Sequence, residues 1–458
     1  MPEKTRLRFL SIKNILLMAL FVRVLLFALV LAKNQRLDAF YTSDTGWYLR
    51  LAASLMEHGR FGSDDMPELI RTPGYPLMLI FGLWSGHVEI ITIVLQVALS
   101  TATCYSLYLT AQQLTRDQRT STLAALLYAI EPLSVLHSVL LLSETLFTFL
   151  IVASLYLLIS ACSMRSLVRF AWAGLCIALS VYVRPVAYFL PFALMLLGLI
   201  FWMISKERRL MISALLVGFV SLGLLSVWQM RNARVADYAG FSATGDFNAY
   251  FHFKAALKSK QESRPFYDCL EELGFYDREA YLNQHPEQRR WTLGERYRFM
   301  QREAISAAES DPRTAAIFYL KGLAISYGDP GAIEYLRLVD LYPKKGRLLN
   351  SVVGSGLFST IKQLIIERPL VVLSNIIFGV LLLSYYALAL GALWRKKFIL
   401  RQDVLLIILT VIYLAITSGG TVGSARLRMP VMPFIVLFAA IGLMRLIDVR
   451  KHQFNLDC

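Results

Sequence analysis

The chain has 458 residues, of which 56% are hydrophobic, and its mean hydropathy is +0.53. These values exclude an ordinary soluble domain and indicate a membrane protein with several spans. The net charge of +15 does not point to nucleic acid, because the basic residues form short clusters between apolar segments, as in proteins oriented in a membrane. The five cysteines include no CxxC pair, so a structural zinc site is not expected.

Apolar segments long enough to cross a bilayer recur along the chain. We predict about ten transmembrane helices, at 10–32, 88–112, 119–137, 141–161, 169–184, 186–204, 209–230, 366–394, 403–419 and 427–447. The shorter apolar segment 74–86 is predicted to be a juxtamembrane helix that does not cross. Every short basic loop then lies on one side, taken as cytoplasmic, whereas a crossing at 74–86 would reverse the later loops. The basic residues of that side are Lys4, Arg6, Arg8, Arg116, Arg119, Arg165, Arg169, Lys206, Arg208, Arg209, Arg395, Lys396, Lys397, Arg401, Arg445, Arg450 and Lys451.

This assignment predicts an all-α polytopic membrane protein with three regions. Residues 1–230 form an N-terminal transmembrane module, and 33–87 are its first outer loop, which contains the juxtamembrane helix. Residues 231–365 form a mostly helical periplasmic loop domain. Residues 366–458 form a C-terminal transmembrane module that ends in a cytoplasmic tail. Within the loop domain, the aromatic, turn-rich stretch 241–253 is predicted to be an irregular loop.

The first outer loop carries the first candidate for chemistry. Apolar residues recur at helical spacing over 46–58, which predicts an amphipathic helix in the membrane interface with Asp44 at its start. One interpretation is that Ser43 or Asp44 only caps this helix, a common use of aspartate. The other is that the Asp44 carboxylate accepts a proton from an attacking hydroxyl. The two are given about equal weight and do not exclude each other.

Other charged residues lie at the outer ends of predicted spans. Glu144 is costly there unless it is paired or solvated, so it is a functional candidate, with snorkelling or a helix-locking hydrogen bond as alternatives. Outer arginines offer paired donors to a phosphate, and headgroup contact is the alternative. These arginines are Arg71, Arg184, Arg426 and Arg428. By contrast, we interpret Arg23 as structural, and Glu131-Pro132 as a kink.

Nucleotide-phosphate motifs are absent from the sequence: there is no GxxxxGK[ST], and no GxGxxG follows a strand. The energy source is therefore not expected to be ATP. We expect the activated group to arrive on a lipid.

Five short motifs occur in order along the chain. They are Asp44-x-x-x-Tyr48, Arg71-Thr72-Pro73-Gly74-Tyr75-Pro76, Ser143-Glu144, Arg184-Pro185 and Arg426-x-Arg428-x-Pro430. Together they resemble the bacterial membrane glycosyltransferases of the GT-C superfamily, above all the protein O-mannosyltransferase-like enzymes and the aminoarabinose transferases that modify lipid A. The resemblance covers about 1–230 and 366–447. The loop 231–365 matches in position only.

The resemblance implies a polyprenyl-phosphate-sugar donor, used on the periplasmic face of the bacterial inner membrane, with inversion at the sugar. It implies that Asp44 is the catalytic base. It also implies a pool of substrate-binding residues: Tyr48, Arg71, Tyr75, Glu144, Arg184, Arg426 and Arg428. The acceptor is a glycolipid, a polysaccharide or a protein. Many relatives carry adjacent acids in this loop, whereas Ser43 and Thr45 flank Asp44 here; no metal ligand is assigned, and use of a divalent metal stays open.

Two alternatives remain at this stage. A flippase or transporter of lipid-linked glycans would explain the spans and the outer arginines, but it predicts acids or broken helices near the bilayer midplane and often internal repeats. A non-catalytic scaffold predicts that changing Asp44 to Asn leaves the phenotype intact.

Overall fold

The structure is a computed structural model that describes residues 11–63, 66–342 and 366–454, with side chains described up to 448. The predicted basic residues Lys4, Arg6 and Arg8 lie outside the described residues. The side chains of Arg450 and Lys451 also lie outside them.

The described chain is almost entirely helical, and the predicted all-α, multi-pass fold is confirmed. Seven segments are long and apolar enough to cross a membrane: α1 (Ile12–Asn34), α4 (Val88–Thr115), α7 (Glu144–Met164), Pro185–Ser205 with η2 (Pro185–Ala187) and α9 (Leu190–Ser205), α10 (Arg208–Ala236), α20 (Pro369–Leu393), and Ala425–Asp448 with α23 (Ala425–Arg428), η5 (Met429–Val431) and most of α24 (Met432–Phe454). Three apolar helices are shorter: α3 (Gly74–Trp84), α8 (Leu167–Val183) and α22 (Gln402–Thr417).

Shorter elements complete the described chain. They are η1 (Leu37–Phe40), α2 (Thr45–His58), α5 (Gln118–Ala129), α6 (Pro132–His137), α11 (Thr244–Asn248), the π-helical η3 (Ala249–Phe253), α12 (Lys254–Glu262), α13 (Phe266–Glu272), α14 (Arg278–Gln284), η4 (Pro286–Arg290), α15 (Leu293–Ser310), α16 (Pro312–Gly328), α17 (Ala332–Leu338) and α21 (Lys396–Ile399). A two-residue hairpin, β1 (Gly62–Ser63) with β2 (Met66–Pro67), pairs Gly62 with Pro67 and Ser63 with Met66, antiparallel.

The span predicted at 119–137 is broken in the structure. It forms α5 and the short α6, with Ile130 and Glu131 between them. Pro132 is the first residue of α6, and the Glu131 carboxylate accepts the backbone N–H groups of Leu133 and Ser134. Proline cannot continue a helix and favours an extended residue before it, so the expected kink is a full break.

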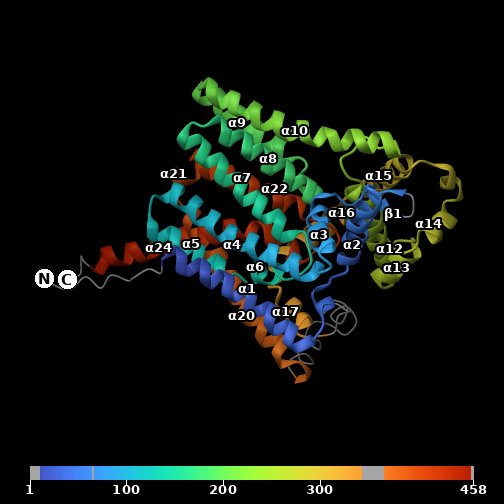
Figure 1. Cartoon of the computed structure of the whole chain (residues 1–458), viewed down its shortest axis with the longest axis horizontal. Helices are drawn as coiled ribbons and strands as arrows, with labels where there is room; N and C mark the ends of the chain where they lie inside the picture. Colours follow the sequence, from blue (N-terminus) through green and yellow to red (C-terminus); the bar gives the residue numbers. More distant parts are fainter. Residues whose placement is uncertain (1–10, 64–65, 343–365, 455–458) are drawn as a thin grey trace.

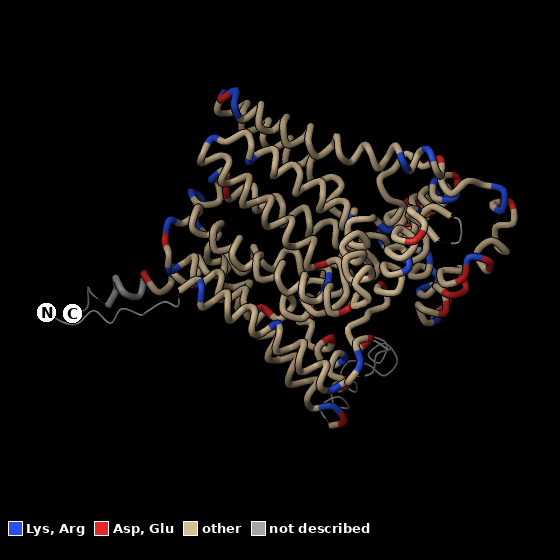
Figure 2. The backbone as a smooth tube through the Cα atoms, viewed as in Figure 1, with Lys and Arg blue, Asp and Glu red and all other residues tan. Residues whose placement is uncertain are grey.

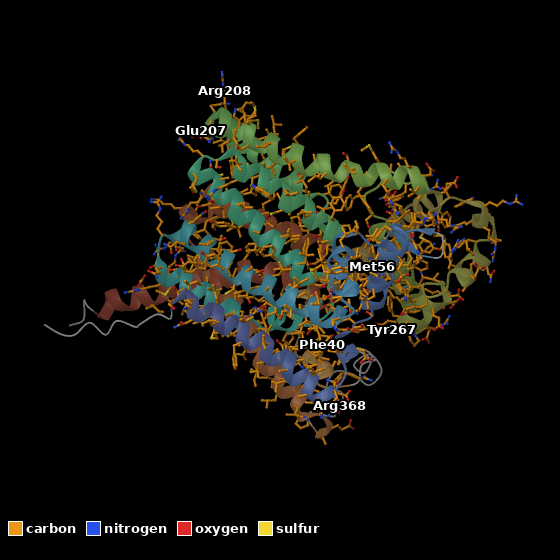
Figure 3. All side chains as sticks on the ribbon, viewed as in Figure 1. Phe40, Met56, Glu207, Arg208, Tyr267 and Arg368 are labelled. Carbon is orange, nitrogen blue, oxygen red and sulfur yellow. The ribbon has the colours of Figure 1, made fainter. Side chains whose placement is uncertain are left out.

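The long helices form a bundle with two different ends. One end, called the loop end below, carries α2, α3 and the segments α11–α16 (Figure 1). The basic turns between the long helices gather at the opposite end (Figure 2). Glu207 and Arg208 mark one such turn, far from Met56 of α2 (Figure 3). At the loop end, Lys and Arg are mixed with Asp and Glu (Figure 2), and this difference between the two ends is the pattern on which the predicted topology rests.

The segments at the loop end have their own small core, in which Tyr250, Phe251 and Tyr281 are buried. The stretch 241–253 is not the irregular loop expected from its sequence. It forms α11 and η3, because burying the aromatic side chains on one helical face outweighs the turn-forming residues. In addition, α10 runs on to Ala236, so the boundary predicted at 230 falls inside a helix.

One close backbone approach joins α16 to the segment that precedes α23. A Cβ atom on Gly322 would lie 1.7 Å from the carbonyl oxygen of Gly420, so only glycine fits at position 322. The Tyr319 hydroxyl also donates to the carbonyl of Ile416 at 2.6 Å. These contacts fix the start of the last membrane segment beside α16.

Candidate active site

Asp44 lies directly before α2 at the loop end, in the position of a helix cap. Its side chain makes no capping hydrogen bond. The neighbouring Thr45 hydroxyl instead accepts the backbone N–H of Thr42 at 2.8 Å and donates to the carbonyl of Leu141 at 2.9 Å. Of the two interpretations of Asp44, the cap does not apply, and the carboxylate is available to other partners.

Two arginines from distant parts of the chain bind this carboxylate. Arg71 Nη2 donates to Oδ1 at 2.7 Å, and Arg426 Nη1 donates to Oδ2 at 2.6 Å. Burial alone would raise the pKa of Asp44, but the guanidinium groups of Arg426 and Arg71 hold that pKa below its ordinary value. Asp44 is therefore an ionised carboxylate at neutral pH.

Glu144 is the second acid of the cluster. It is the first residue of α7 and fully buried, so it does not snorkel to the surface. Its Oε1 accepts hydrogen bonds from Arg184 Nη1 and Arg426 Nε. Its Oε2 is buried and has no partner among the described residues. The helix N-terminus and the two guanidinium groups stabilise the negative charge at this position.

Arg426 links the two acids, so the charges alternate in one chain of contacts from Arg71 through Asp44, Arg426 and Glu144 to Arg184. Three guanidinium groups meet two carboxylates, which leaves one positive charge in excess. Local structure places these side chains: Pro185 ends α8 and keeps Arg184 extended, while the Ser424 side chain caps the turn that carries Arg426.

A cavity of about 90 Å³ opens onto this cluster. Arg71, Arg184 and Arg426 all line it, so its polar wall is positive. Its other lining residues are Tyr48, Ile70, Thr72, Val183, Pro185, Val186 and Thr244. A small cavity with three guanidinium groups and an apolar side suits an anionic group attached to an apolar body.

The two predicted tyrosines have different places. Tyr48 lines the cavity, and its hydroxyl lies 3.4 Å from the Ser143 hydroxyl. Tyr75 does not line the cavity. Its ring packs edge-on against Tyr48 at 4.9 Å between centroids, and its hydroxyl donates to Gln96 at 2.9 Å. The structure therefore gives Tyr75 the position of a support for Tyr48 rather than of a substrate contact.

Arg428 is not brought to the cavity either. Successive residues of a helix turn by about 100°, so Arg426 and Arg428 leave the single turn of α23 in opposite directions. Arg428 is buried against α16, where its Nη1 donates to the carbonyl of Ser326 at 2.7 Å. Among the predicted arginines, this one is placed as an anchor between α23 and α16.

The comparisons with known proteins agree with this architecture. Residues 72–229 match the family model described as dolichyl-phosphate-mannose-protein mannosyltransferase. The structure is similar to the archaeal oligosaccharyltransferase AglB from Archaeoglobus fulgidus in complex with an inhibitory peptide and a dolichol-phosphate, with a TM-score of 0.53, 15% identity, and coverage of 97% of this chain and 51% of that one.

The chain has the GT-C fold. The expected resemblance to the GT-C superfamily is thereby confirmed. A second structure of the Archaeoglobus fulgidus oligosaccharyltransferase, tethered with an acceptor peptide, gives a TM-score of 0.51 at 14% identity and covers 97% of this chain and 50% of that one. This chain thus spans about half the length of these two oligosaccharyltransferase chains. No curated protein sequence matches it. The family match includes Glu144 and Arg184 but not Asp44, Arg71 or Arg426.

Sequence reasoning missed three residues in or next to this site. Thr244 lines the cavity but belongs to the loop that matched no motif. Trp47 and Glu68 contact Arg71 or its backbone from the first loop. The one sequence signal that could have marked Trp47 is its position next to Tyr48, which belongs to one of the five motifs. Nothing in the local pattern marked Glu68.

The acids of the site do not form a metal-binding set. Asp44 and Glu144 are each bonded to guanidinium groups, and the described residues contain no group of three His, Cys, Asp or Glu side chains arranged to hold a metal ion. The side chains present therefore fit an anion better than a divalent cation.

Proposed function

We propose that the protein is an integral-membrane glycosyltransferase that moves a sugar from a polyprenyl-phosphate donor to a hydroxyl group of a lipid, a polysaccharide or a protein. One observation carries the proposal: three arginines from three separate segments line one cavity, and two of them bind the ionised carboxylate of Asp44 directly behind it. The family match and the GT-C fold support it. So does the dolichol-phosphate named in the complex of the similar oligosaccharyltransferase.

The arginines bind the phosphate of the donor in this proposal. Arg71 uses Nη2 for Asp44, while its Nε is buried without a partner. Arg184 contacts Glu144 through Nη1 alone among the contacts of the described residues. Both side chains therefore keep donors for phosphate oxygens without releasing their acids. The excess positive charge of the cluster compensates the charge of the phosphate as it leaves.

Asp44 is the general base. It takes the proton of the acceptor hydroxyl while that oxygen forms a bond to the anomeric carbon of the sugar. The bond between the anomeric carbon and the phosphate oxygen breaks, and polyprenyl phosphate departs with the bonding electrons. A single displacement of this kind inverts the anomeric configuration.

The resting site also accounts for how the base is controlled. While both Asp44 oxygens accept hydrogen bonds from arginines, its lowered pKa makes it a weak base. A bound phosphate adds negative charge beside Arg71 and Arg426, which offsets their electrostatic effect on Asp44 and raises its pKa without breaking their contacts to it. The base therefore gains strength only when a donor is in place, which limits wasteful hydrolysis.

Glu144 positions two of the arginines. Its Oε1 holds both Arg184 and Arg426, the two arginines that line the cavity next to it. Tyr48, Thr72 and Thr244 contribute the remaining polar wall of the cavity. The segment that carries Thr244 thereby takes part in acceptor or sugar selection, as a substrate-facing part of the predicted periplasmic domain.

We further propose that the loop end faces the periplasm of a bacterial inner membrane. The concentration of basic turns at the opposite end supports this orientation (Figure 2). A flippase is less well supported. A transport site needs free binding groups inside the bundle, whereas the charged groups of Arg23 and Glu131 are all hydrogen-bonded by the protein.

The test is mass spectrometry of the lipids, polysaccharides and glycoproteins of the host cell. The strains are wild type, a deletion, and the deletion complemented with Asp44→Asn or with Asp38→Asn. Asp38 is an exposed aspartate of the same loop, paired with Arg36, so its variant repeats the charge change away from the cavity. We expect one glycan to lose a single sugar in the deletion and Asp44→Asn strains, but not with Asp38→Asn. A glycan restored by Asp44→Asn would contradict the proposal.

A further inference from the structure

Glu68 uses both carboxylate oxygens to organise the turn that precedes Arg71. It is 9% exposed. Its Oε1 accepts the backbone N–H groups of Ile70 at 2.5 Å and of Arg71 at 3.0 Å. Its Oε2 accepts the indole N–H of Trp47 at 2.8 Å. One carboxylate therefore joins the start of α2 to the segment that carries Arg71.

Trp47 acts on the other end of the same arginine. The Arg71 guanidinium carbon lies 4.8 Å from the centroid of the indole ring and 5.4 Å from that of Tyr48. Aromatic faces attract a guanidinium group and restrict its plane. Glu68 thus fixes Arg71 twice, at its backbone through Oε1 and at its side chain through Trp47.

The turn is also tied to the rest of the loop end. Arg231, near the end of α10, donates to the carbonyl of Glu68 at 2.9 Å. Ser242 and Thr244 donate to the carbonyl of Ile70, Ser242 at 2.7 Å. Thr244 and Arg71 both line the cavity, so this turn connects a lining residue of the later segment with the lining arginine of the first loop.

We infer that Glu68 is a positioning residue for the donor phosphate: through Trp47 and the backbone of the turn, it holds the Arg71 guanidinium at the cavity against Asp44. The inference rests on the proposed function. It adds to that function a residue which does not line the cavity. Its role is to orient the donor N–H groups of Arg71, because a preorganised guanidinium loses less freedom when it binds a phosphate.

A charge argument alone predicts the opposite effect. Removing the negative charge of Glu68 makes the surroundings of the cavity more positive, which would strengthen binding of an anion. The positioning role predicts weaker binding in Glu68→Gln. In that variant the side-chain amide cannot accept both from the backbone turn and from the Trp47 N–H with the same geometry. The sign of the change therefore separates the two effects.

The experiment measures binding of undecaprenyl phosphate and of undecaprenol to the purified full-length protein in detergent. The alcohol has the same tail and no phosphate, so it reports on the apolar part of the site. Wild type is compared with Glu68→Gln, Trp47→Phe and the double variant. Glu57→Gln is the control, because Glu57 is an exposed acid at the far end of α2. Trp47→Phe keeps a ring under Arg71 but removes the hydrogen bond to Glu68.

We expect Glu68→Gln and Trp47→Phe each to weaken binding of undecaprenyl phosphate about tenfold, the effect of one lost hydrogen bond to a charged group. The double variant should lose no more than the weaker-binding single variant, because both remove the same contact. Binding of undecaprenol, and all binding by Glu57→Gln, should stay at the wild-type level.

Three outcomes would overturn the inference. Unchanged or tighter phosphate binding in Glu68→Gln would show that charge, not position, is what Glu68 contributes. A parallel loss for the phosphate and the alcohol would show a general structural role. If wild type itself does not prefer undecaprenyl phosphate to undecaprenol, the proposed donor is wrong, and the role of Glu68 falls with it.

Discussion

Two arginine sites in this molecule, the buried Arg23 and the partly exposed cluster around Arg426, differ in almost every respect except the residue type. Arg23, inside α1, donates from every guanidinium nitrogen: Nε to Ser100 at 2.8 Å, Nη1 to the carbonyls of Ala19 and Ala129 at 2.9 and 3.0 Å, and Nη2 to Ser134 at 3.3 Å. All four partners are neutral, and the guanidinium joins α1 to the segments of α4, α5 and α6. Protein groups thereby occupy four of its five N–H donors.

The cluster around Arg426 has the opposite character. Its partners are the carboxylates of Asp44 and Glu144, a cavity opens beside it, and two buried atoms, Arg71 Nε and Glu144 Oε2, have no partner among the described residues. Unpaired polar atoms in a protein interior are costly and are retained where a ligand satisfies them. Neither burial nor one unpaired donor indicates function by itself in this bundle, because Arg428 Nε is also buried without a partner among the described residues. The Arg426 cluster differs in having carboxylate partners beside a cavity.

The variant Asp44→Asn is expected to have the largest effect on the transfer rate, and the absence of that effect would break this comparison. In purified protein, Asp44→Asn should slow transfer by about 100- to 10,000-fold, the usual contribution of a general base. Asp38→Asn should transfer at the wild-type rate. The measurement is the initial rate of sugar transfer per folded molecule. A loss of less than about tenfold would assign the proton transfer to another group.

Variants of Arg426 and Arg428, which share one helical turn, distinguish a residue that binds the phosphate from one that anchors α23 to α16. Arg426→Ala leaves the buried Glu144 with one cation, so we expect the free energy of unfolding to fall by about 3–5 kcal/mol. We also expect this variant to lose measurable binding of undecaprenyl phosphate. Arg428→Ala removes the contact to Ser326 and should cost about 1–3 kcal/mol of stability.

Thermal unfolding and phosphate binding are measured on both variants. Binding per folded molecule should stay at the wild-type level in Arg428→Ala. Equal losses of phosphate affinity in the two variants would contradict the placement of Arg428 away from the cavity.

Arg23 should affect stability alone. Arg23→Met keeps most of the side-chain volume but leaves two serine hydroxyls and two carbonyls with one partner fewer. Each buried group left unsatisfied costs about 1–3 kcal/mol. We expect a lower unfolding temperature in detergent together with an unchanged transfer rate per folded molecule. A lower rate without a change in unfolding temperature would give Arg23 a functional role.

The smallest expected effect is a shift in pH dependence. Asp44 acts as a base when deprotonated, and Arg426 and Arg71 hold its pKa below its ordinary value of about 3.9. The acidic limb of kcat/KM in wild type should therefore lie below the range of ordinary aspartates. Arg71→Gln removes one cause of the lowered pKa, so the limb should move to higher pH. An unmoved limb would mean that Arg71 does not set the charge of Asp44.

The same pairing affects stability, with a definite sign. Because the pKa of Asp44 is lower in the folded protein, its contribution to stability is present above the unfolded pKa of about 3.9 and is lost as the pH falls through the folded pKa. Arg71→Gln should reduce this contribution at neutral pH and leave little difference from wild type in strong acid. Thermal unfolding as a function of pH measures it.

Much of the fold could be predicted from hydrophobic segments and charge clusters, because both are patterns of residues that are neighbours in the sequence. Those patterns located the long helices and the short apolar helix α3. They also singled out Asp44, Glu144, Arg184 and Arg426, since charged residues at helix ends must find partners or ligands. The structure brings these four together, and their roles in transfer remain predictions.

The sequence could not predict the directions in which side chains leave a helix, or the contacts between loops. The sequence spacing of Arg426 and Arg428 suggested one shared role, whereas a single helical turn sends them apart. Tyr75 lies behind Tyr48 because α3 packs its apolar face against the bundle. Glu68 and Thr244 act through backbone contacts between loops, which leave no periodic signal in the sequence.

The anomeric configuration of the product tests the central claim most directly. A donor of known configuration is incubated with the purified protein, and the configuration of the new glycosidic bond is read from its NMR coupling constants. If Asp44 deprotonates the acceptor in a single displacement, the product has the inverted configuration. A product with retained configuration would require a covalent sugar–protein intermediate and would contradict the assignment of Asp44 as a general base.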